Sequence, residues 1–143
     1  MKTAHPDGLI LYSGLPGKDF MAVELVGGQI RYAYDVGNSP RVIRVTLRHP
    51  INDNRWHDVA ILRPTLAEQI LRVDNSSKSD VLHDLRSVYF DMGEEVYVGG
   101  IQETMFSTLH KQVGSRRFCS FNALCFLAFI LSSSSLSLRG VVG

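Results

Sequence analysis

Asp19-Phe-Met-Ala-Val-Glu-Leu-Val-Gly-Gly-Gln-Ile-Arg-Tyr-Ala-Tyr-Asp-Val36 is the stretch that decides the fold. Its pattern predicts two strands joined by Gly27 and Gly28. A Gly-Gly pair between alternating apolar runs favours a tight hairpin, because both turn positions require positive φ. The turn also fixes the register. It sets Val26 opposite Gln29 and, at the open end, Asp19 opposite Val36.

This register divides the hairpin into two faces. Opposed residues share a face, so one side is lined by apolar residues: Met21, Val23, Leu25, Ile30, Tyr32 and Tyr34. The other side carries Glu24 opposite Arg31, a cross-strand ion pair. We therefore expect an antiparallel sheet that covers a core on one side only.

Similar short runs, rich in apolar and β-branched residues, recur along the chain at intervals of about 8–12 residues, with turn signals between them. The expected strands are 9–12, 41–47, 56–63, 68–73 and 96–100. Residues 74–80 are expected to form a polar loop. No stretch longer than about ten residues has helical periodicity. The sequence thus predicts an all-β protein, an antiparallel sandwich of two sheets.

Composition sets the class of protein. The chain has 143 residues, 45% of them hydrophobic and 20% charged, which suits one globular domain. A net charge of +1 implies no general attraction to nucleic acid or to acidic membranes. The two cysteines, Cys119 and Cys125, give neither a disulfide framework nor metal-ligand spacing. The first residues contain no apolar segment of a signal peptide.

The composition changes at Arg116-Arg117. No charged residue occurs from Phe118 to Leu138. The apolar run 118–131 is shorter than the roughly 20 residues that a membrane-spanning helix needs. We expect 118–143 to be an apolar and serine-rich tail foreign to the domain, from a read-through or an alternative terminal exon. A membrane-associating tail is the alternative.

Four motifs occur in order within residues 1–117: Asp7-Gly8-Leu9-Ile10-Leu11-Tyr12; Asp19-Phe20 through Glu24-Leu25; Asn52-Asp53-x-x-Trp56-His57-x-Val59; and Val96-Tyr97-Val98-Gly99-Gly100. With these motifs the segment resembles a laminin G-like domain, in particular those of neurexin-type cell-surface receptors. The resemblance implies a jelly-roll-like, concanavalin A-like sandwich in an extracellular adhesion protein. The simplest roles of Trp56 and Val59 are core and strand-edge packing.

The sequence departs from the family pattern at both ends. Few residues precede Asp7, where the family has further strands. Phe118-Cys119-Ser120 stands where the family has a glycine-containing segment that closes the sheets. We therefore expect a truncated sandwich with unpaired edges. It would be a fragment of an extracellular or cell-surface protein, or else a gene product without independent function.

The resemblance further implies a calcium ion on the rim of the sandwich. Its ligand positions match Asp19, the carbonyl of Val36, Tyr89 and Asp91. The register supports the first two independently, because opposed strand residues have Cα atoms about 4.5–5.5 Å apart. Few carboxylates suggest a dissociation constant on the order of 10⁻⁴–10⁻³ M, as in extracellular modules. Alternatively, Asp19 only caps a strand and Asp91 only starts a turn.

Other features bear on partners. Asn75-Ser76-Ser77 is an N-glycosylation sequon in a polar segment, consistent with secretion. Arg41, Arg44 and Arg48 form only a weak basic stripe for heparan sulfate or another glycosaminoglycan, because Arg41 differs from the others in strand parity.

No enzymatic constellation stands out. His57 and Asp58 are neighbours on a predicted strand and point to opposite faces, which argues against a catalytic triad with Ser13. Glu94 and Glu95 lie together in a predicted turn, where carboxylates are usually solvated. We expect a non-enzymatic module that binds cell-surface or secreted proteins, at synaptic contacts if the neurexin resemblance extends that far. A carbohydrate-binding or carbohydrate-cleaving sandwich is the alternative.

Overall fold

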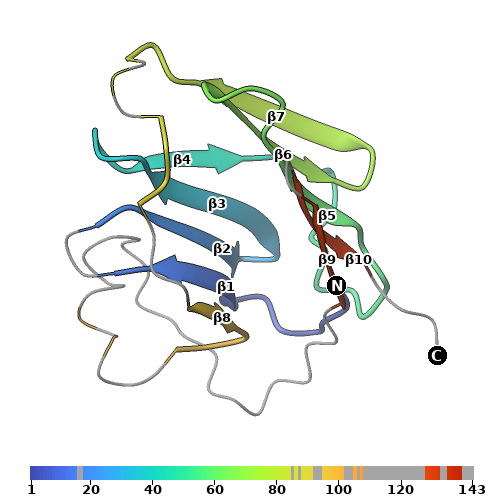
Figure 1. Cartoon of the computed structure of the whole chain (residues 1–143). Coiled ribbons are helices and arrows are strands. Elements are labelled where there is room, and N and C mark those ends of the chain that lie inside the picture. Colours follow the sequence, from blue (N-terminus) through green and yellow to red (C-terminus); the bar gives the residue numbers. More distant parts are fainter. Residues whose placement is uncertain are drawn as a thin grey trace.

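The structure, a computed structural model, describes residues 1–15, 18–84, 86, 88–91, 95–101, 105 and 107, together with the backbone of strands at 128–132 and 135–139. Its strands form two antiparallel sheets that face each other (Figure 1). The predicted all-β sandwich of two antiparallel sheets is confirmed.

Each sheet has five described strands. The first has the spatial order β4-β3-β2-β1-β8 and comprises β1 (Gly8–Gly14), β2 (Phe20–Val26), β3 (Gln29–Asp35), β4 (Arg41–Arg44) and β8 (Val96–Val98). The second has the order β7-β6-β5-β10-β9 and comprises β5 (Val59–Leu62), β6 (Glu68–Val73), β7 (Ser76–Val81), β9 (Ala128–Ser132) and β10 (Ser135–Arg139).

The β2–β3 hairpin has the predicted register. Val26 pairs with Gln29 and Phe20 with Asp35, so Asp19 and Val36 are the next residues outward from the last observed pair. The turn glycines have φ values of 57° and 75°, as a type I′ turn requires. The predicted core face is also confirmed. Its members are buried in the main core, with Met21 packed at the margin: Val23, Leu25, Ile30, Tyr32 and Tyr34.

The opposite face of the hairpin is not open to solvent, and the expectation of a core on one side only is wrong. A second cluster of buried side chains lies on this face: Leu9, Tyr12, Phe20, Ala22 and Ala33. Ile101 and Met105, which follow β8, pack against this cluster. Glu24 is consequently only 2% exposed, and its Oε2 lies 2.9 Å from Nε of Arg31. The predicted ion pair exists, but it is buried.

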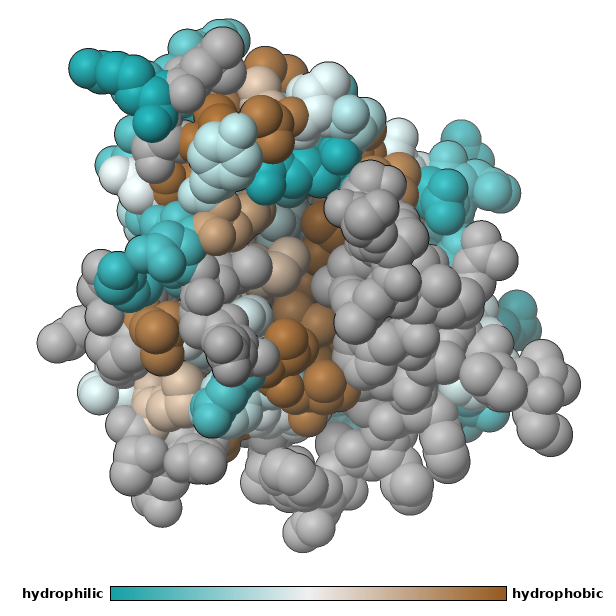
Figure 2. Space-filling model, viewed as in Figure 1, coloured by the Kyte–Doolittle hydropathy of each residue, from teal (hydrophilic) through white to brown (hydrophobic). Residues whose placement is uncertain are grey.

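The main core lies between the two sheets. Val59, Ile61, Leu71 and Val73 of the second sheet join the hairpin residues in one cluster. On the face seen in Figure 2, hydrophobic residues gather along the line between the sheets, and hydrophilic residues lie over the strand ends. Fully burying one large apolar side chain contributes about 1.5–3 kcal/mol. This cluster is therefore the principal source of stability among the described residues.

The segment 74–80 is not the predicted loop. Asp74 has a φ of 51° and, with Asn75, forms a tight turn between β6 and β7. Ser76 then pairs with Val73, and Val81 with Glu68. The strand could not be predicted from the sequence, because β7 is a mostly exposed edge strand. Such a strand lacks the alternation of apolar and polar residues that marks a half-buried strand.

The packing role expected of Trp56 is wrong, because its side chain is 42% exposed. β5 begins only at Val59, which is fully buried as predicted. β4 ends at Arg44 instead of continuing to Leu47.

Part of the tail expected to be foreign to the domain lies in the second sheet. Ser135 to Leu138 of β10 pair antiparallel with Leu62 to Val59 of β5. A free strand edge offers backbone donors and acceptors to any extended segment, so this edge of β5 is paired despite the unusual composition of the tail. The boundary predicted at residue 117 stays a prediction, and 118–127 lie outside the described residues. Within the described part of the chain, no helix has the length and hydropathy needed to cross a bilayer.

Candidate functional site

The candidate site lies at the open end of the β2–β3 hairpin. Asp19 directly precedes β2 and is only 9% exposed. Its Oδ2 accepts a hydrogen bond of 2.7 Å from the backbone N–H of Asp91. The two residues are 72 positions apart in sequence. The structure therefore brings together the two aspartates that were predicted to share a site.

Lys18 also contacts Asp91. Its Nζ lies 2.7 Å from Oδ2 of Asp91, and both side chains are largely exposed. The hydrogen bond to Asp91, the charge of Asp91 and the charge of Asp19 together raise the pKa of Lys18. Because the pair lies in water, it is weak and a competing cation can displace it.

The other two predicted ligands are placed less directly. Val36 is one pair beyond Phe20–Asp35, so its backbone lies beside Asp19, and its side chain is buried in the core. Tyr89 is two residues before Asp91, and its side chain is 72% exposed. If Tyr89 is a calcium ligand, its main-chain carbonyl would supply the oxygen, because calcium takes carbonyl and carboxylate oxygens.

The chemistry of these residues fits calcium. Asp19 uses one carboxylate oxygen for the Asp91 amide, and its other oxygen accepts no hydrogen bond from any described residue. Carboxylate and main-chain carbonyl oxygens are the ligands that calcium takes. The described residues contain no group of three or more His, Cys, Asp or Glu arranged around a metal position. A metal site among these residues would therefore need main-chain carbonyls besides the Asp19 carboxylate, and the expected affinity stays a prediction.

A second polar cluster, Tyr34, Arg41 and Asp80, borders the site. Nε and Nη2 of Arg41 donate to the two oxygens of Asp80 at 2.5 and 2.6 Å, and the Tyr34 hydroxyl donates to Oδ2 at 2.8 Å. The hydrogen bonds from Arg41 and Tyr34 lower the pKa of Asp80, despite its partial burial. Burial and the bond to Asp80 raise the pKa of Tyr34. The cluster thereby ties the first sheet to the end of β7.

Arg63 and Phe90 connect the second sheet to the segment that carries Asp91. The guanidinium carbon of Arg63 lies 5.1 Å from the centroid of the Phe90 ring, in a cation–π contact. Nη2 of Arg63 donates to the carbonyls of Leu66 and Val88. Sequence reasoning missed this pair, because nothing in the pattern showed that residues 63 and 90 meet. The only available signal was an arginine directly after an apolar strand.

Exposed apolar side chains surround this end of the sandwich. Together with Asp19 and Asp91 they are termed the rim here: Leu15, Leu66, Val81 and Tyr89, each between 44% and 72% exposed. The carbonyls of Leu15, Leu66 and Val81 accept hydrogen bonds from Lys18, Arg63 and Arg41. Single exposed apolar residues are ordinary, but a group around a polar centre is typical of an interaction surface.

His57 belongs to a different cluster, near the closed end of the hairpin. Its Nδ1 lies 2.8 Å from Oδ2 of Asp74, and its Nε2 lies 3.0 Å from Oδ1 of Asp53. Burial lowers the pKa of His57, but the hydrogen bonds to Asp74 and Asp53 outweigh that effect and raise it. The Asp53 and His57 positions of the third motif therefore have a structural role: they hold a loop against the β6–β7 turn.

The sequon residue Asn75 lies in the β6–β7 turn and is exposed. Ser77, the third residue of the sequon, is also exposed. The position is accessible to a glycosyltransferase, and the modification itself stays a prediction.

Comparison with known proteins shows which family the chain belongs to. The laminin G domain family matches residues 1–119. The chain belongs to the laminin G domain family. It is 38% identical over 115 residues to mouse neurexin-2 and also to neurexin 1 of Drosophila melanogaster. These alignments cover 80% of the chain but only 7% and 6% of the two neurexins.

Solved laminin G structures share the fold. Domains LG4-5 of the mouse laminin alpha1 chain superpose with a TM-score of 0.62 and 18% identity, covering 95% of this chain and 32% of that one. The LG1-3 region of the laminin alpha2 chain gives 0.59 and 16%, covering 96% of this chain and 24% of that one. Membership of this family, with likeness to neurexins, fits an extracellular adhesion module. The family consists of binding modules without enzymatic activity.

Proposed function

We propose that this laminin G domain is an extracellular recognition module that binds cell-surface or secreted proteins through its rim, with a weakly held calcium ion organising the rim. The observation that carries the proposal is the hydrogen bond from the Asp91 amide to the Asp19 carboxylate. It holds the Tyr89–Asp91 segment against the start of β2. It also leaves one carboxylate oxygen without a hydrogen bond from the described residues.

Calcium would strengthen the same connection. Asp19, the Val36 carbonyl and the Tyr89–Asp91 segment come from three separate parts of the chain. An ion shared among them would fix their relative positions and hence the exposed side chains of Leu15 and Tyr89. Partner recognition would then depend on calcium even if the partner never touches the metal.

Calcium titration of the 143-residue chain tests the metal. At a calcium concentration about tenfold above the dissociation constant, binding to the folded state stabilises it by about 1.4 kcal/mol. We expect Asp19→Ala to abolish this stabilisation. Asp53→Ala, which removes an exposed carboxylate near the closed end, serves as the matched control and should retain it. Equal calcium binding by the wild type and Asp19→Ala would show that Asp19 is not a calcium ligand.

Partner recognition needs a separate test. Binding to a panel of purified cell-surface ectodomains should require calcium and should be lost in Tyr89→Ala, because Tyr89 is the most exposed large apolar side chain of the rim. Binding that survives both EDTA and Tyr89→Ala would place the interface elsewhere.

The glycan alternative has less support. Arg41 of the predicted basic stripe is bonded to Asp80 through two hydrogen bonds, which leaves only Arg44 and Arg48 of the three. A glycan array together with a hydrolase screen separates the alternatives. Turnover that one carboxylate substitution abolishes would instead indicate an enzyme.

A further inference from the structure

A groove outside the rim site runs between two strand edges. β4 is the outermost described strand of the first sheet, and β7 is the outermost described strand of the second (Figure 1). The groove has a volume of about 550 Å³ and is open to solvent. It is lined by all of β4 and by three residues of β7: Lys78, Ser79 and Asp80. No described strand pairs with the outer side of either β4 or β7.

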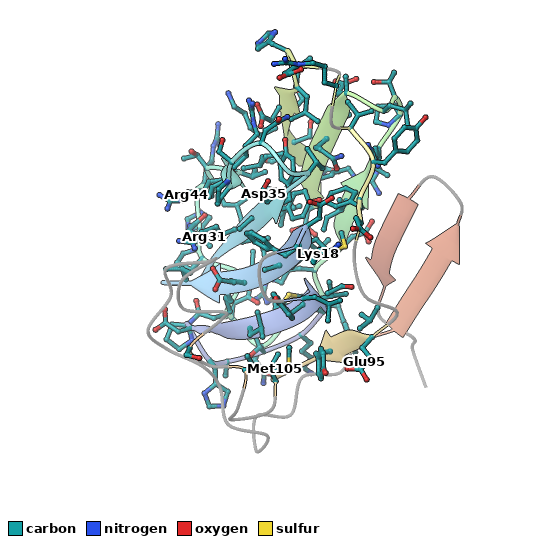
Figure 3. The ribbon with its side chains drawn as sticks, turned by 60° about the vertical axis from the view of Figure 1, so that its left-hand side comes forward. Lys18, Arg31, Asp35, Arg44, Glu95 and Met105 are labelled. Atoms are coloured by element: carbon teal, nitrogen blue, oxygen red, sulfur yellow. The ribbon has the colours of Figure 1, made fainter. Side chains whose placement is uncertain are left out.

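The groove carries an excess of positive charge. Arg41 and Asp80 neutralise each other through their paired hydrogen bonds. Arg44 and Lys78 are exposed, and neither forms an ion pair within the described part of the chain. Arg31, which pairs with Arg44 across β3 and β4 and lies near it in Figure 3, already has a carboxylate partner. Two cations thus remain available beside a free strand edge.

We propose that this groove binds an acidic peptide segment in an extended conformation. The peptide adds to the free edge of β4 as a further antiparallel or parallel strand of the first sheet. Its carboxylates lie against Arg44 and Lys78, and an apolar residue lies against the exposed side chain of Val42. Opposed residues of neighbouring strands interact in this way throughout antiparallel sheets.

The strand edge favours a peptide over a sulfated polysaccharide. An edge presents N–H and C=O groups in a fixed alternation, and only another peptide backbone matches that pattern. A polysulfate gains affinity from a field summed over many cations, whereas this groove has two uncommitted ones. The Asp80 carboxylate also lines the groove, and it would repel a ligand with many closely spaced negative charges.

The same charges have a protective effect. Charged side chains on edge strands normally prevent association with other strands. Arg44 and Lys78 have the same sign, so they repel cationic strands and the β4 edge of a second copy of this chain. An acidic strand is attracted, and specificity therefore comes from charge as well as from backbone pairing.

Fluorescence anisotropy with the full chain tests this proposal. The probe is a labelled peptide of about eight residues, close to a typical strand length, with Val at every fourth position and Glu at the others, because Val42 and Arg44 lie two residues apart on one face of β4. A peptide with Lys in place of Glu should not bind. Arg44→Glu and Lys78→Glu should each weaken binding by about tenfold, the effect of reversing one close charge. Arg86→Glu reverses an exposed arginine outside the groove and should leave affinity unchanged. Circular dichroism confirms that each variant is folded.

Backbone methylation separates strand addition from simple charge attraction. N-methyl groups on alternate residues block one edge of the peptide, and shifting them by one residue blocks the other edge. One methylated peptide should lose binding and the other should keep it. Equal binding by both methylated peptides would overturn the proposal, and so would equal losses of affinity in Arg44→Glu and Arg86→Glu.

A heparin oligosaccharide that binds more tightly than the peptide and loses affinity in Arg44→Glu would identify a sulfated glycan instead. None of these outcomes involves Asp19, so they do not bear on the calcium proposal.

Discussion

The two ends of the β2–β3 hairpin are held largely by different kinds of interaction. At the closed end, most bonds to the turn come from the backbone: Gly28 N–H donates to the Pro6 carbonyl at 2.7 Å, and Ile51 N–H donates to the Gly28 carbonyl at 2.9 Å. One carboxylate joins them, because Gly27 N–H donates to Oδ1 of Asp7 at 2.8 Å. At the open end, charged side chains make the connections, through Asp19, Asp91, Arg41 and Asp80.

The difference separates stability from recognition. Backbone hydrogen bonds at a glycine turn depend on the path of the chain, so they tolerate few substitutions. Side-chain contacts at the open end depend on residue type, and they can change while the sheet stays intact. Binding sites commonly lie on loops that a rigid scaffold positions in this way. The predictions below test whether the closed half governs stability and the open half governs binding.

The largest effect is expected from Arg31→Met, within the hairpin. Glu24 is only 2% exposed, so the variant removes the guanidinium that forms an ion pair with a buried carboxylate. Breaking a buried ion pair from one side costs about 3–5 kcal/mol. Urea denaturation measures the loss. The double variant Glu24→Leu with Arg31→Met should recover most of the stability, and a double variant as unstable as the single one would contradict this explanation.

Gly28→Ala should be nearly as damaging, while Gly27→Ala should be milder. A Cβ at Gly28 would lie 2.5 Å from Cβ of Pro50 and 2.4 Å from Oδ1 of Asn52, whereas a Cβ at Gly27 meets nothing within 4 Å. Both changes incur a positive-φ cost of about 1–2 kcal/mol. Only Gly28→Ala adds overpacking, of about 1–3 kcal/mol. Equal midpoints in urea would show that contact with residues 50–52 is unimportant.

At the open end, Asp19→Ala in EDTA should cost less, about 1–2 kcal/mol, because it leaves the partly buried Asp91 amide without its acceptor. The loss should appear in urea denaturation, with an unchanged m-value. A cost as large as that of Arg31→Met would mean that the open end governs stability as well.

The His57 cluster predicts a small pH dependence. The folded-state pKa of His57 is raised above its unfolded value of about 6.5. Its contribution is therefore fully present below that value and is lost as the pH rises through the folded pKa. With solvent screening, we expect a change of less than about 1 kcal/mol. Melting temperatures between pH 6 and 8.5 should fall more steeply for the wild type than for His57→Gln. Parallel curves would contradict the assignment.

Glycosylation at Asn75 should have the smallest effect on stability, because the turn is exposed. In a secretory expression system, the wild type should show an electrophoretic shift that a glycosidase removes. Asn75→Gln should abolish the shift. Asn38→Gln is the matched control and should not alter it, because Pro40 stands where the sequon requires Ser or Thr.

Much of the first sheet could be predicted locally. Gly27-Gly28 and strict alternation identified the hairpin, its register and its core face. β6 was also predicted with its observed bounds, Glu68–Val73. β7 could not be predicted, because an exposed edge strand has no buried side from which alternation arises. Burial of the second face of the hairpin was not predicted either, because it depends on Ile101 and Met105, which pack against residues far away in sequence.

The candidate site divides in the same way. The turn register predicted that Asp19 and Val36 lie at the same end of the hairpin, next to the observed pair Phe20–Asp35. The contact of Asp19 with Asp91 rested on family resemblance until the structure placed them together. The roles of Lys18, Arg63 and Phe90 at the rim were not predicted, and neither was the groove between β4 and β7.

By itself the sequence determined the hairpin, because a two-residue glycine turn and a period of two are local properties of the chain. Only the tertiary structure decided that Glu24 and Arg31 are buried, that Trp56 is exposed, and that the edges of β4 and β7 lie next to each other. Burial and edge contact depend on which distant segments come together. Strand periodicity shows which face a side chain is on, but not what covers that face.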